Sequence, residues 1–190
     1  MYRLLPWLRW GTVAVLVSLL ILDVAFPLPL PKTRDAATIV VARDGSPLRA
    51  FADARGVWRY PSTPESVSPL YLQALLGYED RWFWQHPGVN PIAMLRAGAQ
   101  MLRSRHIVSG GSTLTMQVAR IIDPALRDGR SRSVGGKLRQ VLRALQLEAH
   151  LSKRQILTLY LERAPFGGPI EGVEAASWAY LGKPAAQLSP

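Results

Sequence analysis

The hydrophobic pattern divides the chain into an apolar N-terminal stretch and a longer body with helical periodicity. Residues 7–26 read WLRWGTVAVLVSLLILDVAF, close to the ~20 residues that a bilayer-spanning helix needs. Arg9 and Asp23 lie near its ends, where polar side chains can reach the headgroups, and Trp7 and Trp10 fall at the expected interface. The pattern predicts an uncleaved transmembrane anchor over residues 7–26.

A cleavable signal peptide is the alternative interpretation of this stretch. The charged start fits it, but no Ala-x-Ala site appears and closely spaced prolines follow at once. Arg3 and Arg9 orient residues 1–6 towards the cytoplasm, although Lys32 and Arg34 on the far side weaken this orientation. We therefore expect a single-pass protein of the cytoplasmic (inner) membrane whose body lies on the periplasmic, extracytoplasmic side.

The next segments predict a linker and a small β structure. Residues 27–37 are spaced by prolines, which is typical of a stiff, extended linker that lifts the body off the membrane. Two apolar runs, 38–42 and 48–51, flank the turn sequence DGSP at 44–47 and predict a β-hairpin. Residues 57–60 are expected to add another short strand.

From residue 68 onwards, apolar positions recur with helical spacing, so a mainly α domain is predicted over residues 38–190. In the long helix expected over 134–151, the pattern places five residues towards the core: Leu138, Val141, Leu142, Leu145 and Leu151. The other helices are expected to begin at Ser68 or Pro69, after the cap Asn90, at the cap Ser112, after the capping box Ser152-Lys153-Arg154-Gln155, and near residue 170.

Composition restricts the chemistry. The chain has no cysteine, which excludes disulfides, thiol nucleophiles and Cys-ligated zinc. A net charge of +10 favours an anionic partner: a nucleic acid, a phospholipid surface or a phosphorylated substrate. The sequence shows no His/Asp/Glu cluster with metal-ligand spacing and no Gly-x-Ser-x-Gly elbow.

Glu79 is the candidate catalytic carboxylate. It follows Tyr78 and precedes Trp82-Phe83-Trp84, and apolar surroundings of this kind raise the pKa of a carboxyl group towards the working range of an acid or base. The ordinary alternative is a solvated acid at a helix end, and it is the motifs nearby that favour a catalytic role. Asp80 is expected to be a structural neighbour of Glu79 and not a second catalyst.

A glycine-rich turn and many cations surround this acid in the sequence. Gly110-Gly111-Ser112-Thr113 offers the free N–H groups of a helix start to a phosphate or a sugar, although the same residues suit an ordinary loop-to-cap transition. Gln117 adds an amide suited to sugar hydroxyls. A solvated helix face explains most of the cations, which are Arg120, Arg130, Arg132, Lys137, Arg139, Arg143 and Lys153.

One carboxylate among many cations favours a particular reaction. Glycosidases usually need two carboxylates, because a sugar leaving group must be protonated. A pyrophosphate leaving group needs no proton: Lys or Arg neutralises its developing charge while one base deprotonates the attacking hydroxyl. The composition of this region fits the second arrangement.

Four motifs carry a resemblance to a known family. They are Glu79-Asp80-x-x-Phe83-x-x-His86-x-Gly88, Gly110-Gly111-Ser112-Thr113-x-Thr115-x-Gln117, Ser152-Lys153-x-x-Ile156-Leu157-x-x-Tyr160-Leu161 and Ala175-Ala176-x-x-Ala179-Tyr180-x-Gly182-Lys183. In this order they resemble the peptidoglycan glycosyltransferases, glycosyltransferase family 51, which form the N-terminal module of class A penicillin-binding proteins. The segments 79–84 and 164–168 are most similar to the 1C type.

The resemblance implies a lysozyme-like, mainly α fold that polymerises lipid II into glycan strands and releases undecaprenyl pyrophosphate. It implies that Glu79 is the general base on the acceptor sugar's 4-hydroxyl. The implied substrate-binding residues are Asp80, Phe83, His86, Ser112, Thr113, Gln117, Arg120, Lys137, Gln140 and Lys153. No cofactor is required, although a divalent cation could lie beside the pyrophosphate. The implied partners are lipid II, the growing glycan strand, the cytoplasmic membrane and a cell-wall synthesis complex, without nucleic acid.

The chain departs from the family pattern at several positions. The usual Arg-Lys-x-x-Glu motif reads Gly136-Lys137-Leu138-Arg139-Gln140, so an amide replaces the second carboxylate. Met116 stands where glutamine is common, and Glu162 replaces an asparagine. The family normally continues beyond residue 190, and no Ser-x-x-Lys, Ser-x-Asn and Lys-Thr-Gly set is present. We expect a glycosyltransferase domain truncated at its C-terminal end, without a transpeptidase domain.

Two other functions stay open at this point. A lysozyme-like hydrolase would cut glycan, and the missing second acid argues against it. A non-catalytic membrane protein that binds lipid II or joins a cell-wall complex is favoured by the truncation and by Gln140.

Overall fold

The computed structural model describes Trp10, Val13, Val17, Leu20, Ile21 and residues 23–31, 37–44, 47–96, 111–127 and 133–189. Its helices are α2 (Pro69–Glu79), α4 (Leu114–Ile122), α5 (Pro124–Arg127), α6 (Val134–His150), α7 (Lys153–Arg163) and α8 (Val173–Leu181), with a further helical turn at 91–96. Its strands are β1 (Thr38–Val41), β2 (Pro47–Phe51), β3 (Trp58–Arg59) and β4 (Ile170–Glu171), and two 3₁₀ turns lie at Pro64–Ser66 and Ala185–Gln187.

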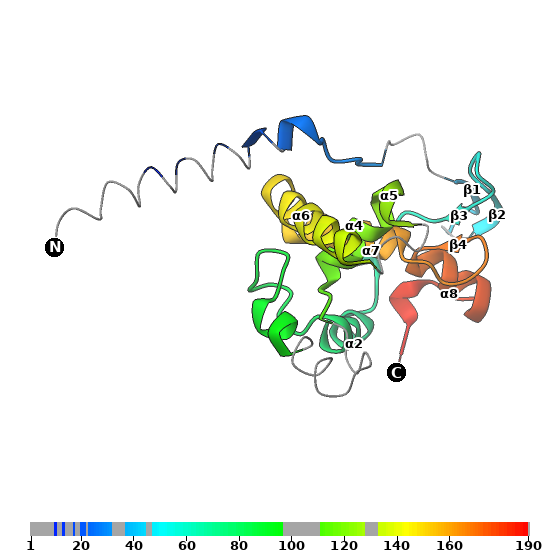
Figure 1. Ribbon diagram of the computed structural model, residues 1–190. Coiled ribbons are helices and arrows are strands. Elements are labelled where there is room, and N and C mark those ends of the chain that lie inside the picture. Colours follow the sequence, from blue (N-terminus) through cyan, green and yellow to red (C-terminus); the bar gives the residue numbers. More distant parts are fainter. Residues whose placement is uncertain are drawn as a thin grey trace.

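Helix α4 lies at the centre of the body, with α6 and α7 packed against it (Figure 1). Six of its nine residues are buried: five are apolar, and the sixth, Thr115, is hydrogen-bonded to Glu148. The core joins α4 to the middle of α7 and to the buried ring of Phe83, with Leu114, Val118, Leu147, Ile156, Leu157 and Leu161 among its members. The predicted mainly α class is confirmed, and the architecture fits a lysozyme-like domain.

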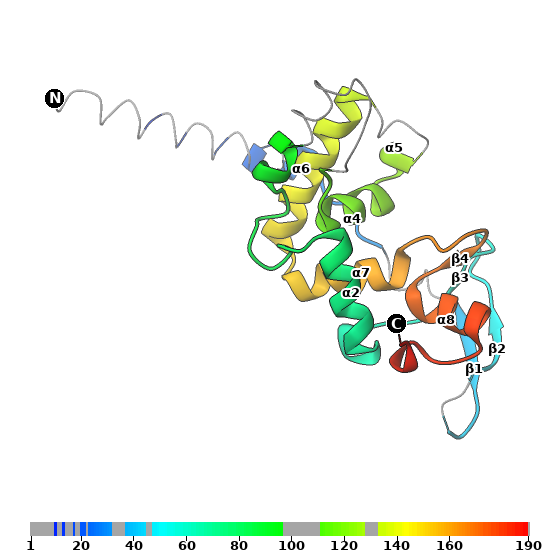
Figure 2. The ribbon, with the colours of Figure 1, turned by 90° about the horizontal axis from the view of Figure 1, so that it is seen from below.

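The β structure lies at one end of the body, beside α8 (Figure 2). The predicted hairpin is confirmed: β1 and β2 pair antiparallel, with Thr38 opposite Phe51. The expected strand near 57–60 is also present, but its partner is β4, in a parallel pair that joins Trp58 to Ile170. The last helix consequently begins at Val173 and not near 170, because residues 170–171 belong to this strand.

Local capping signals were mostly interpreted correctly. Asn90 accepts a hydrogen bond from the Ala93 N–H at 3.0 Å, and Ser152 forms the predicted capping box at the start of α7. The cap of α4 was predicted one residue too early. Thr113, not Ser112, accepts from the Met116 N–H, because the Ser112 hydroxyl is turned towards α6.

The orientation of α6 was predicted wrongly. Leu138, Leu142 and Leu145 are 60%, 45% and 39% exposed, although Val141 and Leu151 do pack against the core clusters. The face turned inward carries Gln140, Arg143, Ala144 and Leu147. Hydrophobic periodicity failed here because the two buried polar residues have partners in α4 and at its end, which makes their burial favourable.

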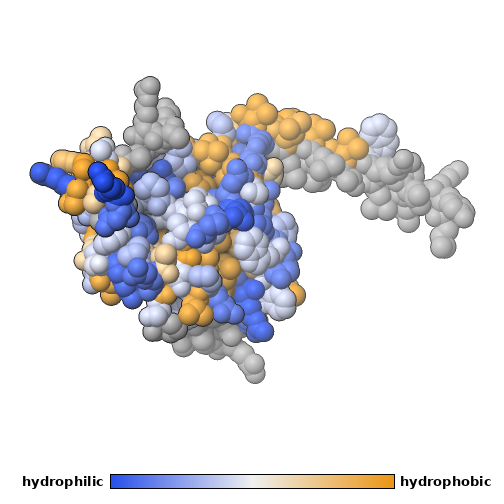
Figure 3. Space-filling view, turned by 180° about the vertical axis from the view of Figure 1, so that it is seen from behind, coloured by the Kyte–Doolittle hydropathy of each residue, from blue (hydrophilic) through white to orange (hydrophobic). Residues whose placement is uncertain are grey.

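Most of the predicted anchor, residues 7–26, lies outside the described residues, and so do linker residues 32–36. In the part of the chain that the structure describes, no helix combines the length and apolar character that crossing a bilayer requires. The described positions of the stretch form a run of apolar side chains leading away from the body (Figure 3).

The end of this stretch is bound to α6. Asp23 accepts from Gln146 Nε2 at 2.6 Å and faces His150 Nε2 at 2.9 Å, while Arg143 Nη1 donates to the carbonyls of Phe26 and Pro27. The first part of the predicted linker therefore lies against the body instead of standing off from it.

A buried carboxylate holds α6 against the end of α4. Asp123 is 1% exposed and accepts from Arg139 Nε at 2.7 Å, from Arg143 Nε at 3.0 Å and from the Ala125 N–H at 3.0 Å. Burial alone raises the pKa of Asp123, but the bonds from Arg139, Ala125 and Arg143 outweigh burial and hold this pKa below its ordinary value of 3.8. The stabilisation is present above that value and is lost as pH falls through the lowered pKa.

Replacing Asp123 with alanine should therefore destabilise the fold strongly. The variant leaves the buried Arg143 guanidinium without its counter-charge, so the free energy of unfolding should fall by about 3–5 kcal/mol at neutral pH, as measured by urea denaturation. The matched control is Glu65→Ala, which removes an exposed pair with Arg154 and should change stability by less than about 1 kcal/mol. Equal losses in the two variants would contradict this assignment.

Candidate active site

Glu79 is the last residue of α2 and faces the second turn of α4. Gln117 Nε2 donates to Glu79 Oε2 at 2.6 Å, so the amide predicted to bind sugar hydroxyls also fixes the carboxylate. The aromatic neighbours expected to surround Glu79 do not do so: Tyr78 is 89% exposed, and Trp82 is exposed as well. Only Phe83 of that group is buried, and it lies in the core.

Two tyrosines that the sequence analysis did not assign lie near Glu79. Burial raises the pKa of Tyr71, and the negative charge of Glu79 raises it further. The same two causes raise the pKa of Tyr160 to about 12, with a further contribution from Tyr71 and an opposing one from Arg120. Both phenols therefore stay protonated and can donate hydrogen bonds near the carboxylate. Tyr71 stands two helical turns before Glu79 in α2, a spacing that could have identified it.

Asp80 and His86 lie behind this carboxylate and face inward. Asp80 is 7% exposed, and its carboxylate accepts from the Leu114 N–H at 2.9 Å and contacts His86 Nε2 at 2.9 and 3.0 Å. Thr113 is also buried, and its hydroxyl donates to the Gly88 carbonyl at 2.5 Å. These residues connect the end of α2 with the start of α4, which agrees with the expectation that Asp80 is a structural neighbour.

Lys137 reaches from α6 to the residue that precedes the cap of α4. Its Nζ donates to Ser112 Oγ at 2.6 Å and to Gln140 Oε1 at 3.1 Å. Burial lowers the pKa of Lys137, and the charge of Arg120 lowers it further. No described carboxylate forms an ion pair with Lys137. Lys137 and the Ser112 hydroxyl therefore lie together just before α4, and Arg120, in the last turn of α4, is near enough for its charge to act on Lys137. Among the described residues no carboxylate forms an ion pair with either cation, which favours binding of a polyanion such as pyrophosphate.

Gln140 lies on the buried side of this site, next to Lys137. It is 4% exposed, and its Nε2 donates to the Met116 carbonyl at 2.7 Å while its Oε1 accepts from Lys137. Both ends of the amide are engaged within the protein. The structure thus places Gln140 as a support for Lys137, although the resemblance implied that it binds substrate.

The predicted residues fall into two groups. Four lie where α2, α4 and α6 meet and are at least partly exposed: Glu79, Ser112, Gln117 and Lys137, with Arg120 exposed on α4. The buried ones support them: Asp80, Phe83, His86, Thr113 and Gln140. Lys153 is intermediate in exposure, and its ammonium lies 4.6 Å from the centre of the Phe83 ring. Among the described residues, no three His, Asp or Glu gather to hold a metal ion, so a divalent cation beside a pyrophosphate stays a prediction.

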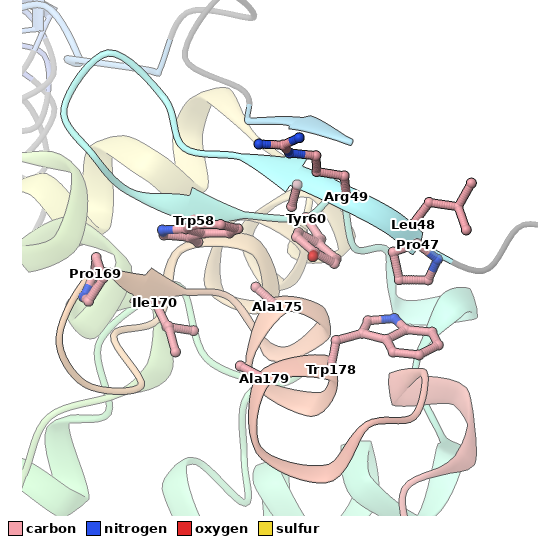
Figure 4. Close-up of a pocket in the computed structure, with 11 residues that line it drawn as sticks. Pro47, Leu48, Arg49, Trp58, Tyr60, Pro169, Ile170, Ala175, Trp178 and Ala179 are labelled. Atoms are coloured by element: carbon pink, nitrogen blue, oxygen red, sulfur yellow. The ribbon is translucent and has the colours of Figure 1, made fainter. Parts of the chain in front are cut away.

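A separate cavity of about 450 Å³ opens between β2, the β3–β4 pair and α8 (Figure 4). Trp58, Tyr60 and Trp178 contribute its aromatic walls, and Arg49 contributes a cation. It contains none of the predicted site residues.

Comparison with known proteins shows the family of the chain. A family model described as Transglycosylase matches residues 44–190. Penicillin-binding protein 1C of Escherichia coli (strain K12) is 60% identical over 185 residues, which cover 95% of this chain and 23% of that protein. Penicillin-binding protein 1A of Pseudomonas aeruginosa is 39% identical over 79% of this chain and 17% of that protein. A biosynthetic peptidoglycan transglycosylase of Nitrosomonas eutropha is 36% identical over 66% of this chain and 50% of that protein.

Glu79 thus lies in one region with the cations Lys137 and Arg120, on a mainly helical body whose described part matches a transglycosylase model. The chain belongs to the transglycosylase family. It spans less than a quarter of the two penicillin-binding proteins and half of the Nitrosomonas relative.

Replacing Gln140 with glutamate should raise the pKa of Lys137. A carboxylate at this position faces the Lys137 ammonium directly and stabilises its charged form. Gln140→Met is the matched control, because it leaves the lysine without a counter-charge and should not raise the pKa. Both variants lose the bond to the Met116 carbonyl, so each should lower the free energy of unfolding by about 1–3 kcal/mol.

Lysine-selective NMR titration and urea denaturation measure the two effects separately. A Lys137 pKa that is the same in Gln140→Glu and Gln140→Met would show that residue 140 does not control the charge of this lysine.

Proposed function

We propose that this chain is a peptidoglycan glycosyltransferase that polymerises lipid II into glycan strands and releases undecaprenyl pyrophosphate. The single observation that supports the proposal is that one carboxylate, Glu79, lies in the same region as Lys137 and Arg120, two cations that form no ion pair with any described carboxylate. Membership of the transglycosylase family and similarity to the biosynthetic peptidoglycan transglycosylase of Nitrosomonas eutropha support the choice of substrate.

In the proposed reaction, Glu79 removes the proton from the acceptor sugar's 4-hydroxyl. The resulting oxygen attacks the anomeric carbon of the donor, and the bond from that carbon to the pyrophosphate oxygen breaks. The electron pair leaves with the pyrophosphate, where Lys137 and Arg120 stabilise the negative charge. The proton remains on Glu79, whose carboxylate Gln117 holds in place. A base and an anion site are sufficient, because this leaving group needs no proton.

We further propose that the protein acts at the cytoplasmic membrane, on its extracytoplasmic side. The described residues of the N-terminal stretch expose large apolar side chains, among them Trp10, Leu20, Ile21 and Val24. On the body, Ile92 and Leu95 are 79% and 75% exposed, and the outer side of α6 exposes Val134 and Leu138. Apolar surface of this extent on a basic protein suits contact with anionic lipid.

Glu79→Gln should abolish glycan extension while leaving the fold intact. The amide has the same shape and can still accept from Gln117, but it cannot take the hydroxyl proton. We expect the rate to fall by about 10²–10⁴-fold in a gel assay with labelled lipid II. Glu162→Gln is the matched control, because the Glu162 side chain forms no hydrogen bond or ion pair with the described residues, and this variant should extend glycan like the wild type.

Extension by Glu79→Gln at the wild-type rate would end the general-base assignment. A wild-type chain that binds lipid II and does not extend it would instead support the non-catalytic alternative.

The full chain should stay with the membrane fraction after an alkaline wash. Extraction at high pH removes proteins held by charge alone, whereas an apolar stretch inserted in the bilayer resists it. Sedimentation followed by immunoblotting measures the partition. Recovery of the protein in the supernatant would contradict insertion of residues 7–26.

A further inference from the structure

Glu148 lies in the last turn of α6, outside the four motifs that carry the family resemblance. Its side chain is 11% exposed. Glu148 Oε1 accepts from Thr115 Oγ1 at 2.6 Å and from Lys153 Nζ at 2.7 Å. Thr115 is fully buried in the first turn of α4, and Lys153 is the first residue of α7. A single carboxylate thus connects three helices.

Through Lys153 the connection extends to the turn that follows the catalytic helix. Lys153 Nζ donates to the His86 carbonyl at 2.6 Å while it rests on the ring of Phe83. Gly88 approaches so closely that a Cβ there would lie 2.7 Å from Glu148 Cγ, and its φ of +81° suits glycine. The turn is therefore packed directly against Glu148 as well as bonded to it through the lysine.

The two segments that Glu148 connects are the ones that carry the proposed chemistry. Residues 80–88 continue directly from Glu79, and α4 carries Gln117 and begins just after Ser112. Among the described residues, two other hydrogen bonds join these segments: Thr113 Oγ1 donates to the Gly88 carbonyl, and the Leu114 N–H donates to Asp80. Glu148 braces the same junction from α6, the helix that carries Lys137.

We infer that Glu148 is a positioning residue for the transfer reaction, a role that rests on the proposed function. With Thr115 and Lys153 it fixes the spacing between the base Glu79 and the anion site at Lys137 and Ser112. Its charge compensates the half-buried lysine, and its acceptor oxygen holds the first turn of α4 in register with the 86–88 turn. It touches neither substrate nor reacting atoms.

The test compares variants that remove or keep the acceptor. Glu148→Met keeps the unbranched chain that packs on Gly88 but removes both oxygens. It should lower kcat about 10- to 100-fold with little change in KM for lipid II, because loss of alignment costs the transition state more than binding. Glu148→Gln keeps an acceptor and should recover most of the rate. Glu162→Met is the matched control on α7 and should retain wild-type kcat.

A second pair of variants separates positioning from general destabilisation. Thr115→Val removes the hydroxyl without changing size and should reproduce the loss in kcat, whereas Thr115→Ser should retain activity. The double variant Thr115→Val/Glu148→Met should be no slower than the slower single variant, because both remove the same bond. Losses that add fully, or that follow the folded fraction seen by circular dichroism, would overturn the inference. So would wild-type kcat in folded Glu148→Met.

Hydrogen exchange provides a readout that does not need the enzyme to turn over. In Glu148→Met, amide exchange should increase together at residues 86–89 and 113–117 and stay unchanged in β1 and β2. A wild-type chain without activity would refute the proposed function and, with it, the positioning role. The exchange measurement would still show whether Glu148 holds the two segments together. Unchanged exchange at both segments would show that Glu148 does not hold them together, whatever the activity.

Discussion

The buried carboxylate of Asp80 is the contact on which the rest of the site depends. Asp80 follows Glu79 directly in the chain. Its carboxylate accepts a hydrogen bond from the Leu114 N–H at the start of α4 and forms another with His86 Nε2. A helix start presents free N–H groups and a partial positive charge, so a carboxylate is well suited to this position. Because Asp80 is held there, the orientation of Glu79 towards Gln117 follows from the chain connection. The two neighbouring acids thus have different roles: Asp80 fixes the geometry, and Glu79 is the residue proposed to act as the base.

The sequence predicted correctly the elements whose signals are local. It failed where contacts with residues distant in the chain determine the structure. Asn90, the capping box at Ser152 and the hairpin around residues 44–47 were interpreted correctly, because each depends on residues within a few positions. The parallel pairing of β3 with β4 was not foreseen, since its partners lie 112 residues apart. The rotation of α6 was missed for the same reason: burial of Gln140 and Arg143 depends on partners in and beyond α4, and no periodicity within α6 contains them.

The sequence predicted which residues belong to the site better than it predicted how those residues are arranged. The motifs named Glu79, Ser112, Gln117 and Lys137, and the structure brings these together around α4. The motifs could not tell which residues face the substrate, so Asp80, Thr113 and Gln140 were grouped with them although they are buried. Tyr71 was missed although it stands two turns before Glu79 in the same helix, a spacing visible in the sequence. Glu148 was missed because its partners Thr115 and Lys153 lie on other helices. Identifying Glu148 requires the packing of α4, α6 and α7, which single-sequence patterns do not contain.

The replacement of a carboxylate by Gln140 has an electrostatic consequence for the whole site. A half-buried lysine costs free energy while it is charged, and a nearby acid would offset that cost in the empty enzyme. Here the amide supplies only a hydrogen bond, and Arg120 adds to the repulsion. The offset must therefore come from the ligand. A site arranged in this way stabilises a bound anion most when that anion carries most negative charge. In the proposed reaction, the charge is greatest as pyrophosphate departs. In the proposed reaction, an amide at position 140 would therefore make the site more selective for the leaving group, and this agrees with the proposal that Glu79 is the single catalytic carboxylate.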